Sequence, residues 1–216
     1  MTAILINIRL LKSVALAAST EQTRYYLNGV HVQLVDEKTV HFAGTDGKGA
    51  IMARQHLGDA ITPRDSEALR AGVIVPLTLI NSIKVNRHAD YAELTIAGGT
   101  ASIHYNASTT TAPLIDATYP NYRGIVPKAF DGVPAQYDPE QLMTFKKAHK
   151  LLGLDGVPVV TYNGQGPAHV AVVPPYHSKE YEVFGVIMPM RTPNAAVPYF
   201  EWVYDTPTSA ATSAAA

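Results

Sequence analysis

The chain has 216 residues, of which 47% are hydrophobic and 16% are charged, and its formal net charge is -1. This length and composition predict a globular protein with one large or two small domains. The nearly balanced charge excludes a globally basic nucleic-acid binder, although it allows a local basic face. Cysteine is absent, which excludes disulfides and thiolate zinc sites and favours a cytoplasmic location. No uncharged apolar run of about 18 residues occurs, so neither a membrane span nor a secretory signal is expected.

The first part of the chain predicts one helix followed by three strands. Residues 1–18 are expected to form an amphipathic helix, because apolar residues recur at helical spacing. This stripe consists of Ile4, Ile8, Leu11, Ala15 and Ala18. Strands are predicted at residues 24–34, 39–44 and 49–55. The segments 36–38 and 45–47 between them are expected to be hairpin turns, since Asp and Gly tolerate the backbone conformations of tight turns.

Two later stretches repeat this order of helix and strands. The first predicts a strand at 73–75, a helix at 77–86 and strands at 91–96, 100–106 and 112–117. The second predicts a strand at 133–137, a helix at 138–152 and strands at 157–162, 169–173 and 182–188. Asp138 is a suitable N-cap for the last helix and Gly153 a suitable stop. The repetition predicts an α+β fold built from βαβββ units.

The sequence offers little catalytic chemistry. Its eight histidines are scattered and show no metal-binding spacing, so neither a metal nor a cofactor is expected. The glycine-rich segment 44–49 lacks the spacing of a phosphate loop and is better interpreted as a hairpin. Asp46 could pair with His41 or His104 for acid–base work, but nothing in the sequence fixes such a geometry, and a polar turn is the simpler interpretation. We therefore expect a protein that is not an enzyme.

Four motifs occur in an order that is typical of one family. They are Arg24-Tyr25-Tyr26-Leu27-Asn28-Gly29, Thr45-Asp46-Gly47, Tyr119-Pro120-Asn121-Tyr122-Arg123 with Val126-Pro127-Lys128, and Val186-Ile187-Met188-Pro189-Met190-Arg191. Together they resemble the bacterial DNA polymerase III beta sliding-clamp family. Residues 1–128 resemble its middle domain and residues 129–191 part of its C-terminal domain. Residues 192–216 are expected to be an extension with aromatic residues and a disordered Thr, Ser and Ala tail. The resemblance implies a shortened clamp that lacks the first domain and half of the third.

The resemblance also implies a DNA-binding surface. In this family, domains form a closed ring with short helices lining the hole and antiparallel sheets outside, and non-specific phosphate contacts suit sliding on DNA. The candidate DNA-binding residues are Arg9, Lys12, Arg24, Tyr25, Lys84, Arg87, Lys146, Lys147 and Lys150. Ordinary solvated helix faces remain an alternative for the helix-borne cations. Glu21 and Leu77 stand at positions where similar clamps have neutral polar or basic residues, which would weaken the hold on DNA.

The second implied site is a hydrophobic cleft that accepts short peptides from polymerases and other partner proteins. Its candidate residues are Leu27, Thr45, Gly47, Pro127, Val186, Met188, Pro189, Met190 and Arg191. Methionines suit such a socket because their side chains repack readily around different partners. These residues could instead belong to the core or to strand ends. The segment 48–50 is smaller than is usual in the family, and the extension after Arg191 could cover the cleft.

These observations lead to a sliding clamp or processivity factor that encircles duplex DNA and tethers a DNA polymerase. Since one and a half domains cannot close a two-subunit ring, we expect a homo-oligomer, either a trimer or a tetramer. A second hypothesis is a decoy or adaptor, encoded by a phage or mobile element, that binds replication proteins without encircling DNA. A third is an enzyme on a related fold with an unrecognised site.

Overall fold

Two antiparallel sheets and a row of short helices form the protein in its computed structural model, which describes residues 2–58, 67–86, 89–174 and 178–191. The smaller sheet has the strand order β1-β6-β7-β8. Its strands are β1 (Thr2–Asn7), β6 (Tyr91–Ala97), β7 (Thr100–Tyr105) and β8 (Ser108–Pro113). The turn between β6 and β7 has Gly98 and Gly99 both at positive φ.

The larger sheet has seven strands and joins the early and late parts of the chain. Its order is β5-β2-β3-β4-β11-β10-β9. The strands are β5 (Val73–Pro76), β2 (Gly29–Leu34), β3 (Thr39–Thr45), β4 (Gly49–His56), β11 (Tyr181–Ile187), β10 (Ala168–Ala171) and β9 (Val159–Thr161). β11 pairs with β4 along its whole length, from Tyr181 opposite Gln55 to Ile187 opposite Gly49. The two parts of the chain are therefore connected by continuous main-chain hydrogen bonds.

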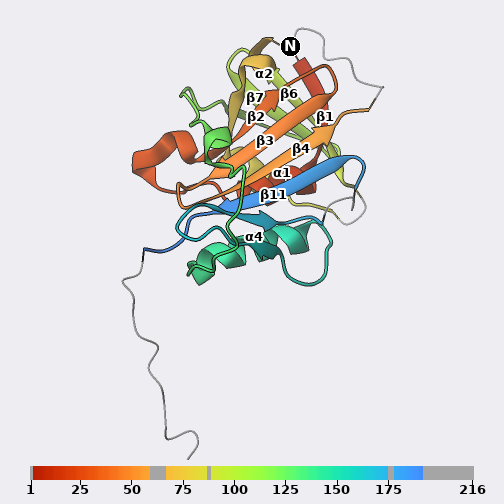
Figure 1. The fold of residues 1–216 in the computed structure, drawn as a ribbon. Helices are drawn as coiled ribbons and strands as arrows, with labels where there is room; N and C mark the ends of the chain where they lie inside the picture. The colour runs from red at the N-terminus through yellow and green to blue at the C-terminus, as the bar shows by residue number, and fades with distance from the viewer. Residues whose placement is uncertain (1, 59–66, 87–88, 175–177, 192–216) are drawn as a thin grey trace, which may run out of the picture.

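The helices lie side by side on one face of the larger sheet, which we call its inner face. They are α1 (Ile8–Ala15), α3 (Leu77–Ser82) and α4 (Pro139–Leu151), and α1 packs against both of the others. Two glycines permit close approach: a Cβ at Gly44 would lie 2.3 Å from the Val14 carbonyl oxygen of α1, and one at Gly185 would lie 2.2 Å from Phe145 of α4. Figure 1 shows α1 behind β3, β4 and β11, with α4 beside β11. The expected α+β fold with helices on one face is confirmed.

Three shorter helical segments lie outside this row. They are α2 (Glu67–Ala71) and the 3-10 segments η1 (Gln22–Leu27) and η2 (Tyr122–Ile125). A single large cluster of buried side chains draws on both sheets, on α1, α3 and α4, and on α2 through Leu69. The early and late parts of the chain therefore share one hydrophobic core.

The prediction of a helix over residues 1–18 is wrong in its first half. Residues 2–7 form β1, in which Ile4 and Ile6 are buried while Leu5 is 41% exposed, as strand alternation requires. The helix begins only after Asn7, whose side-chain oxygen accepts a hydrogen bond from the Leu10 backbone N–H at 3.1 Å. The apolar stripe is thus shared between a strand and a helix, because Asn7 caps the helix at that point.

Several other predicted boundaries also differ. Residues 24–27 are part of η1 rather than of a strand, and no strand forms at 133–137. The helix predicted at 77–86 ends at Ser82, because Ile83 is already extended. Helix α4 agrees with its prediction: Asp138 accepts a hydrogen bond from the Glu140 N–H at 2.9 Å, and Gly153 follows at a φ of 79°. The predicted extension at 192–216, with its tail, falls outside the described residues.

Candidate functional site

The outer face of the larger sheet is partly covered by residues 119–126, which we call the crossing segment. It lies in front of the sheet in Figure 1, where it is green. The Tyr119 hydroxyl donates a hydrogen bond to the Ala43 carbonyl oxygen at 3.1 Å, and burial raises the pKa of Tyr119. The His31 ring stacks on Tyr119 at 5.0 Å and lies 5.6 Å from Tyr122. Aromatic packing thus fixes this segment on the sheet.

A cavity of about 360 Å³ lies beside the crossing segment, and we call it the first cavity. Five of the nine residues expected at a peptide cleft line it. They are Leu27, Thr45, Gly47, Val186 and Met188. Leu27 and Val186 are buried, whereas Met188 is 42% exposed. Residues from the early and late parts of the chain therefore meet in one largely apolar depression.

The turn between β3 and β4 forms one wall of this cavity and is held by its own side chains. Thr45 Oγ1 donates to the Gly49 carbonyl oxygen at 2.7 Å and accepts from the Gly47 N–H at 3.0 Å. Asp46 Oδ1 accepts from the Gly49 N–H at 2.9 Å, and Gln141 Nε2 of α4 donates to Asp46 Oδ2 at 2.7 Å. The hairpin prediction is confirmed. Because Asp46 already occupies an N–H of this turn, the turn is unsuited to holding a phosphate.

The first cavity is also lined by residues that were not predicted from the sequence. They are Arg24, Tyr26, Lys48, Gly49, Pro120, Asn121, Tyr122 and Ile125. Arg24 had been expected at DNA, but its Nη1 donates to the Asp46 carbonyl oxygen at 3.3 Å, beside this cavity. Tyr25 is 56% exposed and does not line the cavity. The motif at 119–123 could have indicated Pro120 and Tyr122, since it belongs to the same resemblance.

The remaining four residues expected at the cleft do not line the first cavity. They are Pro127, Pro189, Met190 and Arg191. The Met188 N–H donates to the Lys48 carbonyl oxygen at 2.9 Å and extends the contact between β11 and β4. The Met190 N–H instead donates to the Gln136 carbonyl oxygen at 2.8 Å, which directs the chain away from the turn. Met190 nevertheless remains 45% exposed.

The cations expected to face DNA fall into two groups. Lys84, just after α3, and Lys146, Lys147 and Lys150 of α4 are exposed to solvent. Arg87 falls outside the described residues. These exposed lysines are available to an external polyanion.

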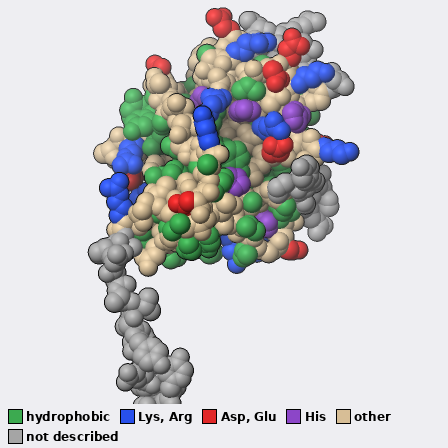
Figure 2. Space-filling view, in the orientation of Figure 1, with side chains coloured by type: hydrophobic (Ala, Val, Ile, Leu, Met, Phe, Trp, Pro, Cys, Tyr) green, Lys and Arg blue, Asp and Glu red, His purple; other side chains and the backbone are tan. Residues whose placement is uncertain are grey.

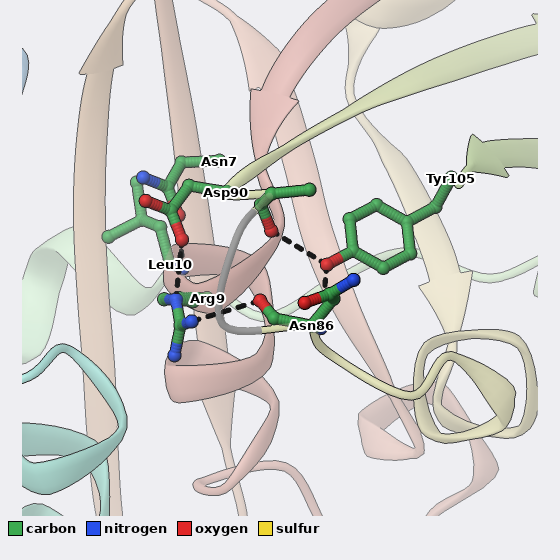
Figure 3. A network of polar contacts seen from close by, with 7 residues as sticks. Asn7, Arg9, Leu10, Asn86, Asp90 and Tyr105 are labelled. Atoms are coloured by element: carbon green, nitrogen blue, oxygen red, sulfur yellow. Dashed lines mark hydrogen bonds and ion pairs between the residues drawn. The ribbon is translucent and has the colours of Figure 1, made fainter.

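Arg9 and Lys12 of α1 are instead engaged within the protein. Arg9 Nε donates to Asp90 Oδ1 at 2.6 Å, and Arg9 Nη2 donates to the Asn86 carbonyl oxygen at 3.0 Å. Figure 3 shows these bonds connecting α1 to the segment between α3 and β6. Lys12 Nζ donates to the carbonyl oxygens of Ile80, at 3.1 Å, and of Ile83, and burial lowers the pKa of Lys12. Both cations thus hold α1 against the end of α3.

The amino-acid sequence is similar to that of known proteins. Residues 6–121 match the family described as DNA polymerase III beta subunit, central domain. The beta sliding clamp of Caulobacter vibrioides is 29% identical over 126 residues, which are 56% of this chain and 32% of that protein. The matched part thus spans about a third of the length of the curated relatives.

Solved structures agree in fold. The beta chain of Streptococcus pneumoniae DNA polymerase III superimposes with a TM-score of 0.65 at 15% identity, covering 89% of this chain and 65% of that one. The beta subunit of Thermotoga maritima gives a TM-score of 0.64 at 12% identity, covering 89% of this chain and 66% of that one.

None of the described helices is long and apolar enough to cross a membrane. The family is non-catalytic, and its model covers more than half of the sequence. The chain therefore belongs to the DNA polymerase III beta sliding-clamp family, through the central domain of that family.

Proposed function

We propose that the protein is a clamp-like scaffold that holds a DNA polymerase, or another DNA enzyme, close to duplex DNA in the cytoplasm. The observation that carries this proposal is the first cavity, whose two walls come from distant parts of the chain and are joined by the pairing of β4 with β11. Tethering needs no chemistry, because it acts by raising the local concentration of the bound enzyme.

The first cavity suits a short peptide with apolar anchors. Its wall combines buried aliphatic side chains, such as Leu27 and Val186, with the exposed thioether of Met188. A methionine adapts to anchors of different shape, and the main chain of the β3–β4 turn offers polar groups at the rim. A partner with a glutamine and a pair of apolar or aromatic residues has the chemistry to fill it.

The row of helices supports the DNA part of the proposal. Because α1, α3 and α4 lie side by side, the exposed lysines of α4 and Lys84, just after α3, lie on the helix side of the sheet, away from the crossing segment. Lys146 and Lys150 are four residues apart and so follow one stripe of α4. Such lysines would contact phosphates without reading bases, as sliding on DNA requires.

A ring would require several copies of the chain. We propose a homo-oligomer, either a trimer or a tetramer, that encircles duplex DNA. The alternative is a decoy or adaptor that keeps the peptide cavity and does not encircle DNA. The absolute mass in solution, measured together with retention on nicked circular DNA, distinguishes them. A monomer that a circle does not retain would reject the ring and leave the adaptor.

The peptide site is tested with two matched methionine variants. Met188→Asp places a charge in the first cavity, whereas Met190→Asp places one at a similarly exposed residue outside it. We expect Met188→Asp to weaken a labelled peptide with one glutamine and a leucine–phenylalanine pair by about 30-fold, from roughly 2 kcal/mol of burial cost. Met190→Asp should change the dissociation constant less than about threefold. Equal affinities for the wild type and Met188→Asp would refute the site.

The DNA surface is tested with paired lysine variants. Lys146→Ala with Lys150→Ala removes two charges from α4, and Lys128→Ala with Lys179→Ala removes two exposed charges elsewhere. On a short linear duplex, the α4 pair should lower the salt dependence of binding by up to about two phosphate contacts. The control pair should leave it almost unchanged. Equal losses in both pairs would contradict a specific DNA-facing surface.

A further inference from the structure

A second cavity, of about 430 Å³, lies on the outer face of the larger sheet. Met52 of β4 and Phe184 of β11 contribute apolar side chains to it, and Tyr122 and Val126 of the crossing segment line it as well. In Figure 2, which shows this face, hydrophobic side chains lie among lysine, arginine, histidine and acidic ones. Charged residues lie at the border of both cavities: Arg24 and Lys48 at the first, and Arg54, Arg123 and Glu182 at the second.

The two cavities are neighbours that share one residue. Tyr122 lines both of them, and it is only 6% exposed. Its hydroxyl is buried and has no hydrogen-bond partner among the described residues. A buried hydroxyl of this kind is costly unless something pairs with it.

The border of the second cavity carries an excess positive charge. Arg54 Nη2 forms an ion pair with Glu182 Oε1 at 2.6 Å, so these two charges compensate each other. Arg123 has neutral contacts: its Nη2 donates to Gln33 Oε1 at 2.8 Å, and its guanidinium lies 4.7 Å from the centre of the Tyr122 ring. No described residue forms an ion pair with Arg123. One guanidinium therefore remains available to a carboxylate.

His41, which also lines the second cavity, adds no charge at neutral pH. Burial and the nearby Arg123 and Arg54 guanidinium groups lower the pKa of its imidazole. The excess positive charge at the border of the second cavity is thus carried by Arg123.

We propose that the second cavity binds an extension of the partner peptide, consisting of an aromatic residue next to an aspartate or glutamate. The aromatic ring packs over the paired side chains of Met52 and Phe184, and the carboxylate pairs with Arg123. The proposal rests on the peptide-binding function of the first cavity and adds a second, charge-selective anchor. Partners with this extension are thereby distinguished from partners that carry the core motif alone.

The test compares three labelled peptides on the wild-type protein. The core peptide carries one glutamine and a leucine–phenylalanine pair, and the others add Phe-Glu or Phe-Gln through a short Gly-Ser spacer, in versions extended at either end. We expect one Phe-Glu version to bind about tenfold more tightly than the core. The matching Phe-Gln version should gain only about threefold. The difference in affinity between the Phe-Glu and Phe-Gln peptides should decrease as the salt concentration is raised, because the Arg123 side chain is exposed to solvent.

Two charge variants locate the effect. Arg123→Gln should abolish the difference between the Phe-Glu and Phe-Gln peptides while leaving core affinity unchanged. Lys128→Gln removes an exposed charge that does not line the second cavity, and it should preserve the difference. If the core peptide binds but the extensions add nothing, or if both variants act alike, the second cavity is refuted and the first remains. If the core peptide does not bind at all, both proposals fail.

Discussion

The inner and outer faces of the seven-stranded sheet have very different surroundings. On the inner face, Phe145 of α4 is 1% exposed and lies directly over Gly185, and α1 approaches equally closely over Gly44. On the outer face, the crossing segment covers part of the sheet, and cavities lie beside it. The difference teaches that packing on the inner face supplies stability, so that the outer face can keep open, partly apolar space for a partner.

The largest effect is expected from a pair of phenylalanine variants on opposite faces. Phe145→Ala opens a cavity between α4 and β11 and should lower the free energy of unfolding by about 3–5 kcal/mol. Phe184→Ala, on the outer face, removes a half-buried ring that stacks on His169 at 5.4 Å. It should cost about 1 kcal/mol, because solvent can occupy the space. Chemical denaturation of both variants measures this contrast, and equal losses would abolish the distinction between the faces.

A pH-dependent effect is expected from His31, which lies beneath the crossing segment. Burial, with a smaller effect of Arg123, lowers the pKa of His31 from 6.5 to about 4. Between these values the unfolded chain binds a proton that the folded protein does not. The free energy of unfolding should therefore fall by on the order of 2 kcal/mol as the pH drops from about 6.5 to 4. The stability that comes from keeping His31 neutral should be fully present above pH 6.5.

The control for His31 is His31→Phe, which keeps an aromatic ring beside Tyr119 and Tyr122 but cannot titrate. Because other histidines also titrate, the relevant quantity is the difference between the urea denaturation curves of the two proteins at pH 7 and pH 5. We expect the wild type to lose more stability than His31→Phe over this range. Parallel losses would mean that His31 is not kept neutral by the fold.

The smallest effect is expected for Arg9. Its side chain is 27% exposed and that of Asp90 is 51% exposed, so their ion pair is well solvated. Arg9→Gln should lower the free energy of unfolding by about 0.5–1 kcal/mol. A double-mutant cycle with Asp90→Asn should recover most of that energy as coupling. If Arg9→Gln instead leaves stability unchanged and weakens binding to a short duplex, Arg9 acts at DNA rather than within the fold.

The strands and α4 were largely predictable, because their turns and caps are local signals. Gly98 and Gly99 mark one hairpin, and Asp138 marks the start of α4. The change from β1 to α1 at Asn7 was missed because the apolar residues on both sides also fit a single helical stripe. Strand alternation at Ile4, Leu5 and Ile6 was the competing signal, and it is only a few residues long.

The candidate site was predictable only in part, because it depends on contacts between distant residues. Leu27, Thr45 and Val186 were found through the family motifs, whereas Pro120 and Ile125 line the first cavity because the crossing segment lies against the sheet. Whether a cation such as Lys12 is exposed depends on which carbonyl groups surround it. No local sequence pattern indicates which residues line the first cavity or which cations are exposed.

The pairing of β4 with β11 has a consequence for the speed of recognition. Thr45, at the end of β3, and Val186 of β11 both lie in one hydrogen-bonded sheet, so the walls of the first cavity need not assemble when a peptide arrives. Association should then proceed in a single kinetic phase whose rate increases linearly with peptide concentration. Variants in the cavity should differ mainly in how long the peptide stays bound.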